Sequence, residues 1–199
     1  MVEEGGNLTL TCTATGHPQP SISWERLGSS LDTKRLIVDG KNFTMESSKL
    51  SDSGKYSCRA ENVINFVTAS ASVVIVPKLH FTVRPPDNVT IWAGKSFVLP
   101  CQVDSANFPV VVTWSRANGQ QLTARHQTLA NGSLVIEKAS NVDQGIYTCS
   151  VRNLVAMLTI NVSVRVTVPG SCGDITKAGF SVSGTYFISP SGLAPFAVY

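Results

Sequence analysis

The sequence has no long hydrophobic run and no cluster of basic residues. Its most apolar stretch, residues 73–76, ends at Pro77 and Lys78, whereas a membrane-spanning helix needs about 18 to 20 apolar residues. The 16 basic and 13 acidic side chains give a net charge of +3 spread along the chain, which is no electrostatic footprint for nucleic acid or an anionic membrane. We therefore expect no membrane insertion and no nucleic-acid partner in this segment.

Side chains that build metal or catalytic sites are also scarce. The three histidines, His17, His80 and His126, have no cysteine or carboxylate at metal-ligand spacing, so we expect them to be surface polar residues. No Gly-x-Ser-x-Gly motif and no pairing of a nucleophile with a base is present. The sequence therefore predicts no metal site, no cofactor and no enzyme activity within these residues.

A secretory signal peptide is missing too, because residues 1–6 are acidic where such a peptide is basic and then apolar. This absence leaves two interpretations, a cytosolic protein or a chain whose ends have been trimmed. The cysteines help to decide between them.

Four of the five cysteines form an internal repeat with near-equal spacings of 46 and 48 positions: Cys12 and Cys58, then Cys101 and Cys149. A tryptophan, Trp24 or Trp114, follows the first cysteine of each pair by 12 or 13 positions. Apolar and polar residues alternate around both first cysteines. This period of two predicts half-buried antiparallel strands rather than helices.

The second half of the repeat is the motif Asp-x-Gly-x-Tyr-x-Cys, at residues 52–58 and again at 143–149. Together with the earlier cysteine and tryptophan it resembles the immunoglobulin superfamily, in which the tyrosine forms a corner before strand F. Only 19 or 20 residues separate each tryptophan from the strand E hydrophobes Phe43 and Leu134, too few for the extra hairpin of variable domains. The resemblance implies an all-β fold of two tandem intermediate-set-like sandwiches, residues 1–77, with strand A largely missing, and residues 78–168.

The same resemblance implies how the repeated residues pair. Cys12 would be joined to Cys58, and Cys101 to Cys149, with the tryptophans packed against the bridges. Strand D arginines would pair with the aspartates of the motif: Arg35 with Asp52 and Arg125 with Asp143. Because disulfides need an oxidising compartment, we expect an extracellular protein, secreted or at the cell surface, of which this sequence is a fragment.

The pattern changes after Pro169. Cys172, the segment Ser-Gly-x-Tyr-x-Ile-x-Pro at 183–190 and Pro-Phe-x-Val-Tyr at 195–199 resemble the start of a fibrinogen-related domain. That resemblance makes residues 169–199 the truncated first part of such a domain. It also leaves Cys172 unpaired, since its partner in that family follows position 199. The alternative is a fibrillar-collagen terminal domain, whose start has similar spacing.

Five Asn-x-Ser/Thr sequons suit a secretory glycoprotein: Asn7, Asn42, Asn88, Asn131 and Asn161. Strand alternation places the first two on one sheet of the first sandwich and leaves the opposite sheet without a sequon. We expect this second sheet to be the binding face, a flat polar surface that includes Ser57, Arg59, Glu61, Ser70 and Ser72. The competing interpretation is that the two sandwiches are only a spacer.

The sequence thus predicts a non-enzymatic extracellular recognition or adhesion segment. Its order resembles that of invertebrate recognition proteins in which immunoglobulin domains display a fibrinogen-related ligand-binding domain. The expected partner is a protein or glycan ligand, with homophilic contact as one form of it. Two alternatives remain, the ectodomain of an adhesion receptor and the ectodomain of a receptor enzyme.

Overall fold

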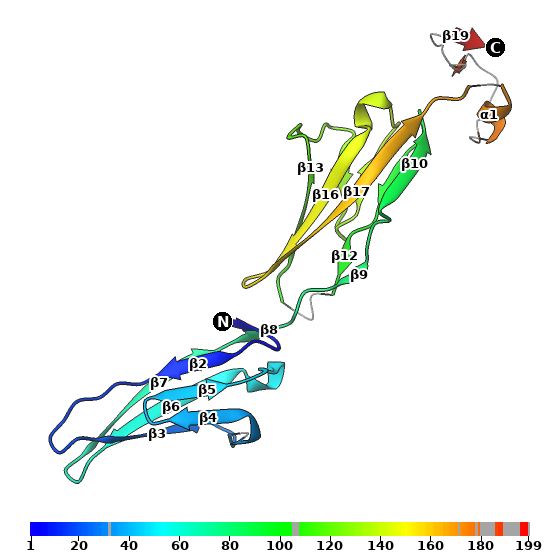
Figure 1. Cartoon of the computed structure of the whole chain (residues 1–199). Coiled ribbons are helices and arrows are strands. Elements are labelled where there is room, and N and C mark those ends of the chain that lie inside the picture. The colour runs from blue at the N-terminus through cyan, green and yellow to red at the C-terminus, as the bar shows by residue number, and fades with distance from the viewer. Residues whose placement is uncertain are drawn as a thin grey trace. The chain divides into compact units, whose positions relative to one another are not determined.

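The computed structural model describes residues 1–31, 33–104, 108–170, 172–177, 179, 186–188 and 196–198. It divides into two compact units (Figure 1). The main part of the first is Met1–Leu79, and the second comprises His80–Asp104, Val111–Val151 and Met157–Tyr199.

The first unit contains two three-stranded antiparallel sheets. One has the order β2–β5–β4, with strands β2 (Leu8–Thr11), β5 (Asn42–Met45) and β4 (Leu36–Asp39). The other has the order β3–β6–β7, with strands β3 (Ser21–Arg26), β6 (Gly54–Glu61) and β7 (Phe66–Val73). A short parallel pair joins β1 (Val2–Glu3) to β8 (Ile75–Val76). Two 3-10 turns, η1 (Thr33–Arg35) and η2 (Leu50–Asp52), connect the strands.

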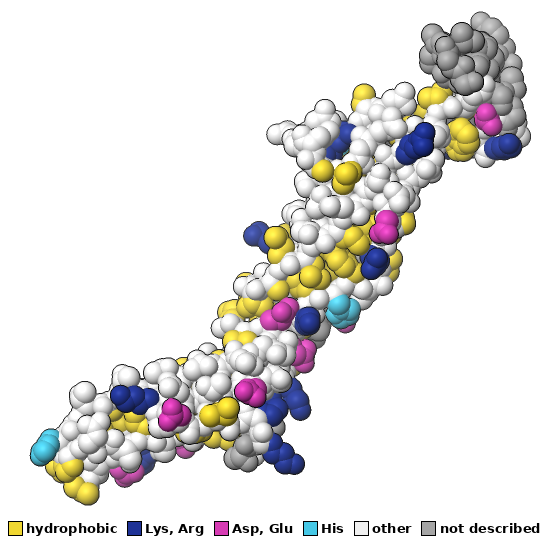
Figure 2. Space-filling view, in the orientation of Figure 1, with side chains coloured by type: hydrophobic (Ala, Val, Ile, Leu, Met, Phe, Trp, Pro, Cys, Tyr) yellow, Lys and Arg dark blue, Asp and Glu magenta, His cyan; other side chains and the backbone are white. Residues whose placement is uncertain are grey.

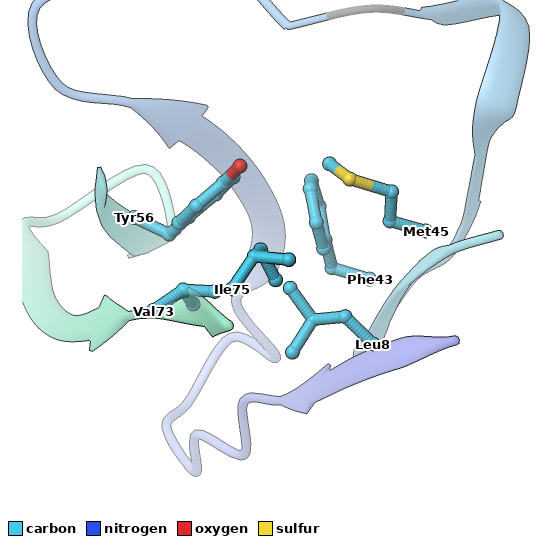
Figure 3. Close-up of a cluster of buried hydrophobic side chains, with 6 residues drawn as sticks. All are labelled: Leu8, Phe43, Met45, Tyr56, Val73 and Ile75. Carbon is cyan, nitrogen blue, oxygen red and sulfur yellow. The ribbon is translucent and has the colours of Figure 1, made fainter. Parts of the chain in front are cut away.

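The core of this unit lies between the two sheets, where side chains from facing strands meet (Figure 3). Its buried members are Leu8, Phe43, Met45, Tyr56, Val73 and Ile75. Phe43 is fully buried, and its ring lies 5.5 Å from Trp24 and 5.3 Å from Tyr56. The alternating pattern of the sequence explains this core, because every second side chain of a strand points to the same face.

The second unit also contains two facing sheets, but one of them has four strands. That sheet has the order β10–β17–β16–β13, with strands β10 (Asn88–Trp92), β17 (Met157–Thr167), β16 (Gly145–Arg152) and β13 (Val111–Arg116). The facing sheet has the order β11–β15–β14, with strands β11 (Phe97–Leu99), β15 (Leu134–Ile136) and β14 (His126–Thr128). Strand β9 (Phe81–Val83) pairs with β12 (Gln102–Val103), and a 3-10 turn η3 spans Asn141–Asp143.

Each unit contains one disulfide between its two layers. Cys12 is bonded to Cys58 with their Cα atoms 6.4 Å apart, and Cys101 to Cys149 with a Cα separation of 6.7 Å. These are the pairs that the family resemblance implied. Cys101 and Cys149 are fully buried among the core residues of the second unit.

The C-terminal residues add the helix α1 (Cys172–Lys177) and the antiparallel pair of β18 (Tyr186–Ile188) with β19 (Phe196–Val198). Within the part of the chain that the structure describes, α1 is the longest helix, with six residues. The predicted all-β fold with two tandem sandwiches is confirmed. The sequence predicted that Cys172 is unpaired in this chain. The side chain of Cys172 lies outside the described residues, so this stays a prediction.

Candidate binding face

A buried ion pair and a tyrosine anchor strand β6, which carries much of the candidate face. Arg35 donates from Nη1 to Oδ2 of Asp52 at 2.9 Å and from Nη2 to Oδ1 at 3.1 Å. The Tyr56 hydroxyl donates to the Asp52 carbonyl at 2.8 Å. Burial alone would raise the pKa of Asp52, but the hydrogen bonds from Arg35 and from the Lys49 N–H lower it. The predicted ion pair is therefore present and fixes the start of β6.

The outward side of the sheet β3–β6–β7 is a polar surface. Ser23 and Glu25 on β3 are exposed, as are Thr68, Ser70 and Ser72 on β7. Exposure alternates along β3, but on β7 every residue from Phe66 to Ser72 is exposed, so exposure there does not separate the two faces. Ser70 and Ser72 of the predicted contact set are thus accessible to a partner.

Ser57 is a correction to that set. The sequence predicted it at the outward surface, but only 5% of Ser57 is exposed. It lies on the central strand of the sheet, opposite Glu25 on β3 and Ser70 on β7. A short hydroxyl side chain between two neighbouring strands is covered by them, so Ser57 offers little surface for binding.

Arg59 is the most organised polar group of the face. Its Nη2 donates to Oε1 of Glu61 at 2.8 Å and its Nε to Oε2 at 3.1 Å. The guanidinium also lies 3.7 Å from the ring centre of Phe66, a cation–π arrangement. The hydrogen bonds from Arg59 lower the pKa of Glu61, so the pair stays charged at neutral pH. Arg59 and Glu61 remain about 39% and 51% exposed, so both groups are open to a ligand.

The turn between β6 and β7 exposes apolar side chains that the sequence analysis did not single out. Asn62 Oδ1 accepts hydrogen bonds from the N–H groups of Ile64 at 3.0 Å and Asn65 at 3.1 Å, which fixes the turn. Val63 is 91% and Ile64 75% exposed. Figure 2 shows apolar side chains gathered at this end of the first unit. The run Val-Ile-Asn-Phe-Val at 63–67 could have signalled the patch, since apolar residues are unusual in an exposed turn.

Phe66 and Val67 continue this apolar surface from the turn onto β7. They are 48% and 65% exposed. Val63, Ile64, Phe66 and Val67 therefore form one exposed group, which we call the apolar turn patch. It lies beside Arg59 and Glu61, so a charged pair and an apolar group are adjacent on the same end of the sheet.

Two of the sequons lie at the sheet β2–β5–β4 of the first unit. Asn7 precedes β2 and is exposed, and Asn42 begins β5 and is half-buried with its Oδ1 bonded to Thr11. Asn88, Asn131 and Asn161 are exposed in the second unit. Among the described residues of β3, β6 and β7, no sequon occurs.

His126 is a second correction. The sequence analysis placed all three histidines at the surface, and His17 and His80 are exposed, but the His126 side chain is 0% exposed. Its Nδ1 accepts from the Thr123 N–H at 3.2 Å, so the neutral ring fits with its proton on Nε2, 3.1 Å from Tyr147 Oη. Burial lowers the pKa of His126, although nearby Asp143 opposes this. The ring is a core group of the second unit, stacked on Tyr147.

The described residues contain no cluster of three or more histidine, cysteine or acidic side chains that could hold a metal ion. Of the helices that the structure describes, none has the length and apolar character required to cross a membrane.

Comparisons with known proteins agree on the type of fold. Residues 1–62 and 80–153 match the sequence profile of a family described as "Immunoglobulin domain". "Peroxidasin homolog" from Homo sapiens is 34% identical over 76% of the chain but only 10% of that protein, and "Protein turtle homolog B" from Homo sapiens is 30% identical over 82% of the chain and 13% of that protein. The chain thus spans roughly a tenth of the length of these relatives.

Among solved structures, "Drosophila OTK, extracellular domains 3-5" superimposes with a TM-score of 0.73 at 22% identity. The match covers 83% of this chain and 58% of that one. At this identity the likeness shows the fold, which is a tandem array of sandwiches.

Proposed function

The chain belongs to the immunoglobulin domain family, and from that premise we propose that it is a recognition segment of an extracellular adhesion-type protein. We propose further that the first unit binds a protein ligand through the sheet β3–β6–β7. The curated matches fall in the residues that form the sandwiches, which favours a non-enzymatic role for this segment.

The observation that carries this proposal is the Arg59–Glu61 pair beside the apolar turn patch. Protein interfaces combine exposed apolar anchors with a polar rim, and arginine and aromatic residues contribute most to their affinity. Here Phe66 contacts the Arg59 guanidinium at 3.7 Å, and Val63 and Ile64 project from a turn held by Asn62. These groups are held in place before binding, so little conformational entropy is lost on association.

The positions of the sequons also favour the sheet β3–β6–β7 as the binding face. We propose that the sequons at Asn7, Asn42, Asn88, Asn131 and Asn161 carry glycans in the secretory pathway. Glycans at Asn7 and Asn42 would cover the sheet β2–β5–β4 of the first unit. The sheet β3–β6–β7 would stay accessible.

We keep two finer parts of the sequence interpretation as proposals. The sandwiches are proposed to form domains at residues 1–77 and 78–168. Residues 169–199 are proposed to begin a fibrinogen-related domain, for which the sequence motifs and the pairing of β18 with β19 are the support. In such a protein the sandwiches would display a further ligand-binding domain, which binds a protein or a glycan.

A binding array tests the face. The probes are purified extracellular immunoglobulin-domain proteins and the chain itself, fixed on a surface and exposed to the labelled full chain. Arg59→Glu and Ile64→Asp are expected to weaken the wild-type signals at least tenfold. Lys41→Glu, a charge reversal at an exposed residue beside Asn42, is the matched control and should retain them. Equal loss in all three variants, or no loss in any, contradicts the proposal.

A further inference from the structure

Strand β14, at the edge of the sheet β11–β15–β14, is attached to the second unit by few contacts. It has three residues, and its neighbour in the described sheet is β15. Gln127 and Thr128 are exposed, whereas the side chain of His126 is fully buried. Of the three side chains of this strand, the His126 ring is therefore the one that anchors β14 in the core.

The buried ring contacts Tyr147 on β16. The two rings are stacked with their centroids 5.8 Å apart, and Nε2 of His126 lies 3.1 Å from Tyr147 Oη. The tyrosine hydroxyl donates its proton to the Asp143 carbonyl at 2.9 Å, so toward the histidine it acts as an acceptor. This arrangement requires a proton on Nε2 of His126.

The other ring nitrogen closes a turn just before β14. Nδ1 of His126 accepts from the Thr123 N–H at 3.2 Å, while the His126 N–H donates to the Thr123 carbonyl at 2.9 Å. A second proton on the ring has to be placed on Nδ1, which converts this acceptor into a donor that faces the Thr123 N–H. Protonation of the buried ring therefore removes the acceptor that closes the turn.

The charged groups around the ring do not compensate for this loss. Arg125, the preceding residue, and Arg116 on β13 both disfavour a positive ring. Asp143 in η3 favours it, with Oδ1 3.6 Å from Nε2, but this carboxylate is already bound by Arg125 and by Ser140. Burial, with the two arginines adding to it, holds the pKa of His126 below 6.5.

Opening of β14 would give the ring access to water. The ladder between β14 and β15 has three residue pairs. At its two ends the Leu129 N–H donates to the Ser133 carbonyl at 2.8 Å and the Glu137 N–H to the Arg125 carbonyl at 2.9 Å. Once this short ladder is broken, His126 can take up a proton with its ordinary pKa of 6.5. Proton uptake is thus coupled to opening.

The sandwich does not require a titratable residue at this position. In the first unit Leu36 on β4 lies opposite Met45, as His126 lies opposite Ile136. Leu36 packs against the apolar core of that unit. The second unit therefore has a proton-binding ring where an apolar side chain serves the same fold.

We propose that His126 is an acid-sensitive latch, by which we mean that proton uptake by its ring separates β14 from β15 while the remaining strands of the second unit stay folded. The separation exposes backbone N–H and C=O groups along the edge of β15, and such groups can pair with another strand. The latch is a property of the second unit and does not depend on the proposed binding face of the first.

Hydrogen exchange of the full chain near pH 7.5 and near pH 5 tests the latch, with rates corrected for the intrinsic effect of pH on exchange. The reporters are the amides of Leu129 and Glu137, because their hydrogen bonds cross between β14 and β15. An exposed histidine gains its proton below 6.5, so protection at both reporters should fall about tenfold in acid.

Two substitutions remove the titrating ring. His126→Gln retains a side-chain acceptor for the Thr123 N–H, and His126→Leu introduces the residue found at position 36 of the first unit. The loss of protection in acid should disappear in both. His17→Gln changes an exposed histidine of the first unit in the same way. It is the matched control and should keep the wild-type response. Circular dichroism checks that each variant is folded.

Low concentrations of urea separate the opening of β14 from unfolding of the whole unit. Exchange through a local opening responds little to urea, because the response scales with the surface exposed. Acid exchange at the reporters should therefore be nearly independent of urea, in contrast to exchange in the central strand β16. In the wild-type chain, unchanged protection in acid or a urea response equal to that of β16 overturns the proposal. An equal acid effect in the His126 variants does so too.

Discussion

Arg125 and Asp143 form a bidentate ion pair beneath the surface of the second unit. Nη1 of Arg125 lies 2.8 Å from Oδ2 of Asp143, and Nη2 lies 2.9 Å from Oδ1. The carboxylate is 1% exposed and the arginine side chain 34% exposed. The pair repeats the geometry of Arg35 with Asp52 and marks the same corner in both sandwiches.

Removing the arginine should therefore destabilise the second unit. Arg125→Ala leaves a buried carboxylate without its partner, and since the arginine is partly solvated we expect a loss of about 1–3 kcal/mol in the free energy of unfolding. Urea denaturation of the full chain measures it. Arg59→Ala, which breaks an exposed pair, is the control and should change stability far less. A comparable effect of the two substitutions would show that burial of Asp143 contributes little.

Stability should fall in acid for two reasons. The pKa values of Asp52 and Asp143 are lowered, because hydrogen bonds from arginine and backbone N–H groups outweigh the effect of burial. Their contribution is present above the ordinary pKa of 3.8 and is lost as the pH falls through the lowered values. His126 lowers stability at a higher pH than the aspartates do, because burial holds its pKa below 6.5. Below pH 6.5 the unfolded chain gains a proton there before the folded unit does.

The histidine effect is specific to the second unit. Leu36 lies opposite Met45 in the first unit where His126 lies opposite Ile136 in the second. His126→Leu should therefore reduce the loss of stability between pH 6.5 and 5, while leaving the decline at lower pH. Calorimetric unfolding at several pH values measures this. An unchanged pH profile in the variant would exclude His126 as the titrating group.

Substitution by phenylalanine should destabilise the protein to different degrees at the two core tryptophans. Trp114 Nε1 donates to the Gly132 carbonyl at 2.8 Å, whereas Trp24 Nε1 is buried and finds no acceptor among the residues described. Both Trp→Phe substitutions reduce volume, but only Trp114→Phe breaks a hydrogen bond. We expect Trp114→Phe to cost about 0.5–1.5 kcal/mol more than Trp24→Phe. Equal losses in denaturation would show that this bond adds no net stability.

Gly132 should resist substitution for steric reasons. Its φ is +86°, and an added Cβ would lie 2.5 Å from the Cys101 carbonyl oxygen. Gly119 has a similar φ of +76° with nothing within 4 Å. Gly119→Ala should therefore cost only the backbone strain of about 1 kcal/mol, and Gly132→Ala clearly more. The denaturation midpoints of the two variants measure this difference. Similar midpoints would contradict the close contact between position 132 and the Cys101 carbonyl.

The features that were predictable from the sequence are those set by spacing. The repeat of Cys12 and Cys58 by Cys101 and Cys149 indicated two sandwiches, and the arginine and aspartate positions indicated the ion pairs. Exposure was harder to predict. Ser57 alternates outward yet is covered by neighbouring strands, and His126 is polar yet satisfied in the core by Thr123 and Tyr147. Burial of a polar group depends on its neighbours in the folded sheets, such as Tyr147 beside His126, and the periodicity of a single sequence does not contain them.

The apolar turn patch shows that the exposure of apolar residues is also hard to predict from sequence. Val63 and Ile64 are hydrophobic and would be assigned to a core by composition alone. They are exposed because the hydrogen bonds of Asn62 hold them in a tight turn beyond the end of the sheet. Such a turn is specified by one side chain rather than by a periodic pattern of apolar and polar residues.

Hydrogen exchange tests the central claim most directly, namely that the sheet β3–β6–β7 of the first unit binds a protein. The full chain would be measured alone and with the protein that gives the strongest array signal, whether another ectodomain or the chain itself. The account predicts slower amide exchange in residues 59–72 and unchanged exchange in β2, β4 and β5. Protection confined to β2, β4 and β5, or to the second unit, would contradict it.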